Sequence, residues 1–159
     1  MHTVIRLVGE YFFVISVVLV ALYWLRCSRS NKVTLGATLV VGGVVSLILM
    51  FIGGKLFYDT RPFVRDHITP IIPHAADNGF PSDHALLTFF LAFALWTWSK
   101  RLSIVLFINA LLVSWARVAA HIHSPLDIAG GLVFALVGAL VGYYAVRAVM
   151  AKRNARAYG

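Results

Sequence analysis

Five apolar runs divide this sequence, and each is close to the length that crosses a lipid bilayer. They cover residues 8–25, 33–53, 82–99, 102–120 and 126–150. Crossing about 30 Å of hydrocarbon takes roughly 20 helical residues. Because backbone polar groups cannot stay unpaired in lipid, runs of this kind predict helices. The expected fold class is therefore an all-α integral membrane protein, a helical bundle of about five transmembrane helices.

Composition supports a membrane protein and argues against several other classes. Hydrophobic residues make up 60% of the 159 residues, against roughly 45–50% in soluble domains. The net charge of +8 does not indicate a nucleic-acid partner, because the basic residues are scattered between the apolar runs. A single cysteine, Cys27, excludes an intramolecular disulfide. We expect residues 1–159 to form one domain, with the first run retained as a span because it lacks a small-residue cleavage site.

Five spans would place the connecting segments alternately on two sides of the membrane, and the charges sort accordingly. The side with more basic residues, including the tail 151–159, is expected to be cytoplasmic. It receives nine of the fourteen: Arg26, Arg29, Lys32, Lys100, Arg101, Arg147, Lys152, Arg153 and Arg156. The outer side receives all six acidic residues and all six histidines. The polar segment 55–84 and the turn 121–127 would therefore meet on the outer side of the plasma or inner membrane.

Lys55 and Arg61 lie at the outer end of the second run, in the sequence KLFYDTRPF. Either could be an ordinary basic residue that reaches from the span to the membrane surface. Pro62 restricts the backbone of Arg61 and favours a defined turn. A guanidinium matches phosphate oxygens with planar donors, and a lysine adds a point charge. Together the two side chains would suit a phosphate clamp.

Ser82, Asp83 and His84 open the third run. Ser82 is typical of a helix N-cap, and Asp83 in the first turn would complement the helix dipole. The free backbone N–H groups at such a helix start also form a ready anion site. An isolated histidine is usually a plain polar residue, but His84 beside an anion site is a candidate proton donor.

The turn before the fifth span holds His123 and Asp127. Ser124, Pro125 and Asp127 fit the first positions of a helix, with proline where its missing N–H costs nothing. A carboxylate four residues after a histidine can reach back to one ring nitrogen and leave the other as nucleophile or base. Arg117 lies near the end of the preceding span, where an unpaired charge is costly unless it faces a polar cavity or an anion.

A metal is the rival interpretation of these histidines. His121 and His123, with Asp127, His84 and Asp83, could supply imidazole and carboxylate ligands. The three cations expected at the same place disfavour a divalent ion and favour a phosphate, and no HExxH or similar motif occurs. We therefore expect neither a metal nor another cofactor.

Taken together, these residues resemble the motifs of the type 2 phosphatidic acid phosphatase superfamily, lipid phosphatases akin to vanadium haloperoxidases. That family carries a lysine followed by an RP pair, a PSxH segment and an R-x5-H-x3-D segment, which match residues 55–131 here in the same order. The resemblance implies a haloperoxidase-like helical core. It implies that His123 is the phosphorylated nucleophile, that Asp127 orients it and that His84 protonates the leaving group. Phosphate binding would fall to Lys55, Arg61, Ser82, Asp83 and Arg117, without a metal.

Several positions depart from the family pattern. The gap between Lys55 and Arg61 is one residue longer than usual, and Ala116 replaces a serine, for which Ser114 is an alternative. Larger members have six spans, so residues 1–7 could hold a sixth, short helix. Residues 63–78 match no motif, and with their apolar residues we interpret them as an interfacial lid.

Asp83 stands where the family often has glycine, a substitution that resembles the bacterial undecaprenyl pyrophosphate phosphatase branch. The resemblance therefore implies hydrolysis of undecaprenyl pyrophosphate to the monophosphate, with the polyprenyl lipid and membrane lipids as partners. Phosphatidylglycerol phosphate, phosphatidate or another lipid phosphate are alternative substrates. A protein that binds or transports an anion or lipid without chemistry is the alternative from another class. The sequence sets no oligomeric state.

Overall fold

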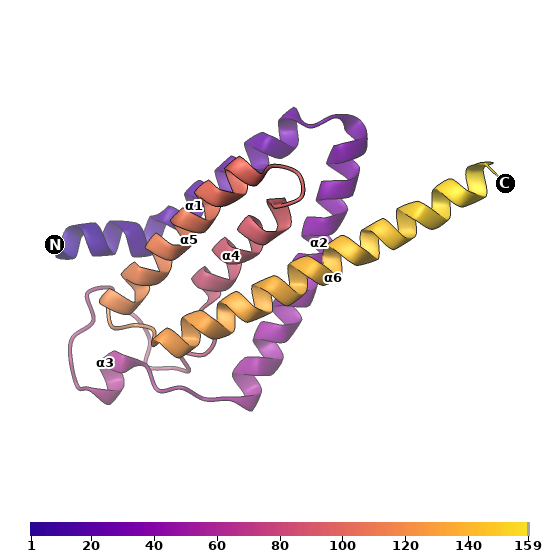
Figure 1. The fold of residues 1–159 in the computed structure, drawn as a ribbon. Helices are drawn as coiled ribbons and strands as arrows, with labels where there is room; N and C mark the ends of the chain where they lie inside the picture. Colours follow the sequence, from indigo (N-terminus) through magenta and orange to yellow (C-terminus); the bar gives the residue numbers. More distant parts are fainter. Residues whose placement is uncertain (159) are drawn as a thin grey trace.

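The computed structural model describes residues 1–158 as a bundle of helices (Figure 1). In this described part the elements, in chain order, are α1 His2–Arg26, α2 Arg29–Leu56, α3 Pro62–Arg65, α4 Asp83–Leu95, α5 Lys100–Ala119 and α6 Pro125–Tyr158. The one β-type pairing among these residues is an isolated bridge between Thr60 and Asn78. The predicted all-α fold is confirmed.

Four of the described helices, α1, α2, α5 and α6, are long and apolar enough to cross a membrane. The predicted span 82–99 is shorter than expected, because α4 ends at Leu95 and a turn leads to α5, whose N-cap is Ser99. Thirteen residues of α-helix measure about 20 Å, less than the hydrocarbon thickness. In Figure 1, α4 lies in the middle of the bundle, among the long helices. It is buried in protein on most of its surface, so its length need not match the bilayer.

The N-terminal residues do not form a separate sixth helix. Residues 2–7 are the first turns of α1, with no proline or glycine to interrupt the helix before Gly9. Arg6 pairs with Glu10 one turn later, with 3.3 Å between Nε and Oε2. At the other end of the chain, the basic tail continues α6 through residue 158 and extends away from the other helices (Figure 1).

Small residues let α2 and α6 pack closely. A Cβ on Gly142 would lie 2.6 Å from the carbonyl oxygen of Thr38, and a Cβ on Gly42 would lie 2.7 Å from that of Gly138. Close approach of this kind is a common basis of helix association in membranes. The central helix α4 fills the space beside this pair with large apolar side chains such as Phe89 and Leu95, which are almost completely buried. The packing fixes where α2, α4 and α6 end relative to one another.

The two predicted polar clusters lie at the same end of the bundle. In Figure 1, the α2–α4 connection, which contains α3, and the short α5–α6 turn come together there, opposite the α1–α2 and α4–α5 connections. The segment 63–78 is packed onto the bundle, unlike a free lid. Its Ile72 is 3% exposed and packs in a cluster with Ile5, Val8, Ala116 and Ile122, and the Ile71 N–H donates to the Ala120 carbonyl at 3.3 Å.

Candidate active site

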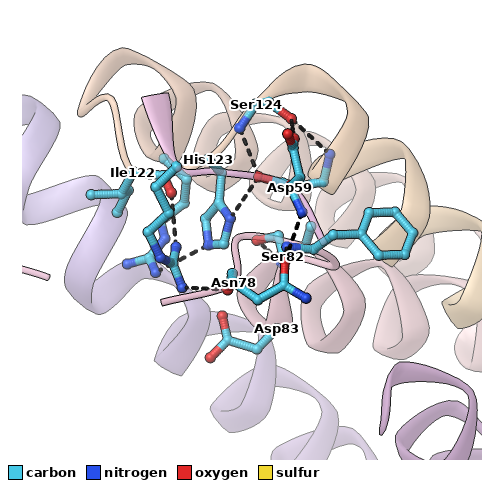
Figure 2. A network of polar contacts seen from close by, with 12 residues as sticks. Asp59, Asn78, Ser82, Asp83, Ile122, His123 and Ser124 are labelled. Atoms are coloured by element: carbon cyan, nitrogen blue, oxygen red, sulfur yellow. Dashed lines mark hydrogen bonds and ion pairs between the residues drawn. The ribbon is translucent and has the colours of Figure 1, made fainter. Parts of the chain in front are cut away.

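His123 and Asp127 form a buried pair at the start of α6. His123 Nδ1 lies 3.2 Å from Asp127 Oδ2, and the two side chains are 2% and 0% exposed. The Ser124 N–H donates to the same carboxylate oxygen at 2.8 Å, and the Asp127 N–H donates to Ser124 Oγ at 3.2 Å. This reciprocal cap, predicted from the sequence, fixes Asp127 (Figure 2). An ionised Asp127 can only accept hydrogen bonds, so Nδ1 carries the proton and Nε2 keeps its lone pair.

Arg117 faces the free nitrogen of this histidine. Its Nη2 lies 3.5 Å from His123 Nε2, and the side chain is 3% exposed at the end of α5. A guanidinium has no acceptor, so this contact also requires an unprotonated Nε2. Burial, opposed by the Asp127 hydrogen bond and reinforced by Arg117 and Arg61, lowers the pKa of His123 below its ordinary value. The ring is therefore neutral at pH 7 and presents an unprotonated nitrogen next to a buried cation.

Arg61 is held by three acceptors from two segments. Its Nε donates to Asp77 Oδ1 at 2.7 Å, its Nη1 to the Ile122 carbonyl at 2.8 Å and its Nη2 to the Asn78 carbonyl at 3.1 Å. The side chain is 5% exposed. Of the five N–H groups of a guanidinium, these contacts use three and leave one on each terminal nitrogen. Arg61 is thus fixed in place with a two-donor edge that remains available for a phosphate.

Asn78 joins the end of α2 to the segment that leads into α4, and sequence reasoning missed it. Its Nδ2 donates to the carbonyls of Gly54 and Phe57 at 2.8 and 2.9 Å. Its Oδ1 accepts the N–H groups of Asp59 and Phe80 at 2.9 and 3.0 Å. The only sequence signal was the Asn-Gly dipeptide, which is typical of a turn. All four hydrogen bonds of this amide are made, so it joins the end of α2 firmly to the segment before α4 (Figure 2).

The start of α4 meets the start of α6. Ser82 is buried as the N-cap of α4, accepting the Ala85 N–H at 3.5 Å, and its own N–H donates to the Asp127 carbonyl at 3.1 Å. The predicted cap is therefore confirmed, and it contacts the backbone of the residue that orients His123. Gly79 lies at the same junction: a Cβ there would be 2.8 Å from Asp127 Oδ2, so glycine permits the close approach.

His84 lies at the rim of the site, apart from His123. Its Nδ1 is 2.9 Å from Asp83 Oδ1, and its ring packs edge-on against Phe13 with 5.0 Å between centroids. About a fifth of the side chain is exposed. Asp83 fixes the orientation of this imidazole and leaves Nε2 without a contact to another described residue.

A cavity of about 400 Å³ brings four of the eight predicted residues together. Lys55, Arg61, Asp83 and His123 line it, and His74 and Asp77 line it as well, which the sequence did not indicate. The Lys55 ammonium lies 4.5 Å from the centre of the Phe51 ring. Arg117 and Asp127 do not line the cavity but contact His123, which does, and Ser82 is hydrogen-bonded to the backbone of Asp127. Three basic side chains around a neutral histidine favour an anion of phosphate size.

A second, apolar cavity of about 530 Å³ adjoins the first. It lies between α1, α2 and α4 and is lined by side chains such as Phe13, Leu47 and Leu91, with His84 at its polar end. Met50 and Asp83 line both cavities, so the two are adjacent. The site can therefore accept a molecule that has an anionic group at one end and a hydrocarbon chain at the other.

The residues of the rival metal interpretation form pairs, such as His123 with Asp127 and His84 with Asp83. Among residues 1–158, no group of three or more histidine, cysteine or acidic side chains could hold a metal ion. His121 is exposed and takes a positive φ of 62° at the turn after α5, whereas His123 is buried two residues later.

Comparisons with known proteins agree with these observations. The family model described as PAP2 superfamily matches residues 31–151. YbjG of Escherichia coli (strain K12), which carries a provisional name as an undecaprenyl-diphosphatase, is 43% identical over 100 residues, 60% of this chain and 49% of that protein. The undecaprenyl-diphosphatase BcrC of Bacillus subtilis (strain 168) is 30% identical over 122 residues, 77% of this chain and 62% of that protein.

Two further relatives extend the comparison. The bacitracin transport permease protein BcrC of Bacillus licheniformis is 28% identical over 145 residues, 91% of this chain and 71% of that protein. The crystal structure of Aquifex aeolicus LpxE has a similar fold, with a TM-score of 0.64 and 21% identity over 87% of this chain and 91% of that one. The chain spans about half the length of YbjG and less than two thirds of the Bacillus subtilis protein.

Proposed function

The chain belongs to the PAP2 superfamily, and we propose that it is a membrane lipid phosphatase that hydrolyses undecaprenyl pyrophosphate to undecaprenyl phosphate and inorganic phosphate. The observation that carries the proposal is the buried His123–Asp127 pair, whose free Nε2 faces Arg117 beside a cavity lined by Arg61 and Lys55. A buried, oriented and neutral imidazole among fixed cations is suited to attack a phosphoryl group.

In the first step, His123 Nε2 attacks the terminal phosphorus. A nitrogen–phosphorus bond forms while the bond from phosphorus to the bridging oxygen breaks. His84 donates a proton to that oxygen, and undecaprenyl phosphate leaves. Arg61, Arg117 and Lys55 stabilise the negative charge on the equatorial oxygens. Asp127 stabilises the positive charge that develops on the His123 ring.

In the second step, water hydrolyses the phosphohistidine. His84, now without its proton, accepts one from the water, whose oxygen bonds to phosphorus as the nitrogen–phosphorus bond breaks. Inorganic phosphate leaves, and His123 returns to its neutral form. No metal takes part in either step, since fixed cations supply the charge stabilisation.

The adjacency of the two cavities supports a lipid substrate. A diphosphate in the polar cavity would place the first part of its hydrocarbon chain in the apolar cavity between α1, α2 and α4, past Asp83 and His84. The names of YbjG and of the Bacillus subtilis BcrC favour undecaprenyl pyrophosphate over phosphatidylglycerol phosphate or phosphatidate. The charge distribution favours a site on the outer side of the membrane.

The test is phosphate release by the purified protein in detergent or vesicles, on a panel of undecaprenyl pyrophosphate, phosphatidylglycerol phosphate and phosphatidate. We expect undecaprenyl pyrophosphate to be hydrolysed fastest, unaffected by excess EDTA. His123→Ala is expected to lose at least the roughly 10²-fold typical of an acid–base group. Near wild-type release by that variant would contradict the proposal.

Transport without hydrolysis is the second candidate, favoured by the name of the Bacillus licheniformis relative. The same pocket of cations could bind an anion, but a transporter has no chemical need for the oriented His123–Asp127 pair. Transport and hydrolysis are distinguished by mixing the protein with substrate labelled on the terminal phosphate, quenching rapidly without acid and measuring the label bound covalently to the protein. We expect the label on His123, whereas a transporter would retain no covalent label.

A further inference from the structure

His74 is a third histidine of the phosphate cavity, and it belongs to none of the motifs used above. Its ring centroid lies 6.3 Å from that of His123, with the two planes at 69°. It lines the same cavity as Arg61, Lys55 and His123. Its side chain is 25% exposed, so it is neither a buried packing residue nor a free surface residue.

The loop that carries His74 is fixed on both sides of it. Two residues before, Ile72 is 3% exposed, and its Cδ1 lies so close to α1 that a Cβ on Gly9 would be 2.8 Å away. Three residues after, Asp77 accepts the Arg61 Nε–H at 2.7 Å. The contacts of Ile72 with α1 and of Asp77 with Arg61 therefore hold His74 in place before any ligand binds. Such preorganisation favours a precise contact with the ligand.

The surroundings of His74 suit contact with an anion. Nδ1 lies 3.3 Å from the Ala75 carbonyl and 4.0 Å from Asp77 Oδ1. Burial first, then Arg61 and Arg117, lower the pKa of His74, while the Ala75 carbonyl and Asp77 oppose this. The cations that lower the pKa are those that would bind a phosphate. An anion among them offsets their charge, so the ring can take up a proton as it binds.

We propose that His74 is a substrate-binding residue that donates a hydrogen bond to a non-bridging oxygen of the phosphoryl group held between Arg61 and His123. A ring separation of 6.3 Å leaves room for a phosphoryl group on His123 Nε2 to present an oxygen to the His74 imidazole. The inference rests on the proposed phosphatase function, but it concerns phosphate binding and can be tested without turnover.

The experiment compares His74→Asn with His67→Asn, a matched change in the same loop. His67 is exposed and outside the cavity, and its positive φ of 53° is one that asparagine tolerates. The first measurement is the rise in thermal unfolding midpoint caused by inorganic phosphate, and the second is phosphate inhibition of lipid hydrolysis. We expect His74→Asn to weaken phosphate binding about tenfold, because a charged hydrogen bond is lost. His67→Asn should match the wild type.

His74→Gln serves as a second variant. Glutamine and asparagine both carry an amide N–H donor, but the longer glutamine side chain extends that donor further into the cavity. It should recover part of the phosphate affinity that His74→Asn loses. Phosphate affinities within twofold of the wild type in both variants would overturn the inference while leaving the phosphatase proposal intact. Wild-type protein that binds phosphate but hydrolyses no lipid would contradict the phosphatase proposal, and the binding comparison would still decide the role of His74.

Discussion

Ser124 Oγ donates a hydrogen bond to Asp59 Oδ2 at 2.6 Å, and this contact ties the segment after α2 to the start of α6 (Figure 2). The same hydroxyl oxygen accepts the Asp127 N–H, and the Ser124 N–H donates to the Asp127 carboxylate. Asp59 is itself fixed, because its carbonyl accepts the Gly79 N–H at 2.9 Å and its N–H donates to Asn78. We therefore expect Asp59 to act on the His123–Asp127 pair through one serine, as a positioning residue.

Removing either partner of this contact should lower turnover through a shared effect. We expect Asp59→Ala and Ser124→Ala each to lower kcat about tenfold or more, since small displacements of catalytic groups are costly, and to change KM little. The kcat of the double variant should fall no further than that of the more impaired single variant, because both substitutions break the same Ser124–Asp59 hydrogen bond. A matched control is Asp66→Ala, whose carboxylate pairs with exposed Arg65 instead. Fully additive losses would show that the two residues act separately.

Asp127→Asn tests the orientation of the nucleophile. The amide is nearly the same size as the carboxylate, and its oxygen can still accept the Ser124 N–H and the His123 Nδ1–H, but it carries no negative charge to balance a positive ring. We expect kcat to fall by at least about 10²-fold while phosphate binding is retained. Trapping of labelled phosphohistidine should fall in parallel. Unchanged trapping kinetics would show that Asp127 serves only the helix cap.

The apolar cavity predicts a dependence on the length of the substrate chain. A Cβ on Gly43 would lie 3.7 Å from the Phe90 ring, so a small side chain fits, whereas Gly43→Phe would fill the cavity. This variant should hydrolyse a water-soluble short-chain diphosphate at the wild-type rate. It should hydrolyse undecaprenyl pyrophosphate at least about tenfold more slowly than the wild type. Val44→Phe adds a ring on an exposed part of the same helix and serves as the control. Equal rates of the two variants on undecaprenyl pyrophosphate would show that its hydrocarbon chain does not bind in this cavity.

The lowered pKa of His123 predicts a loss of stability in acid. The unfolded chain takes up a proton near the ordinary histidine pKa of about 6.5, whereas the buried ring in the folded protein does so only at lower pH. The folded state therefore loses stability as the pH falls below about 6.5, and it gains nothing from this group at higher pH. His123→Asn should show a smaller fall in unfolding midpoint between pH 7 and pH 5. An identical fall in both proteins would assign the acid sensitivity to other groups.

The path of the segment 63–78 could not be predicted from the sequence. Its apolar residues suggested an interfacial lid, because a pattern alone does not distinguish burial against protein from contact with lipid. The structure buries Ile72 against α1 and α5, and in doing so it brings His74 and Asp77 into the phosphate cavity. Similarly, the length of the apolar run 82–99 predicted a span, whereas α4 ends at Leu95 and, because the other helices enclose it, need not match the bilayer thickness.

The sequence by itself determined the features that depend on neighbouring residues: the apolar helices, the caps at Ser82 and Ser124, and the spacing that lets Asp127 reach His123. These follow from local periodicity and from hydrogen bonds over three or four positions. Only the tertiary structure decided that Arg61 is held by Asp77 and Ile122, that Asp59 holds Ser124, and that His74 lies beside His123. Such contacts join residues 16 to 65 positions apart, and their geometry is set by the close packing of α2, α4 and α6.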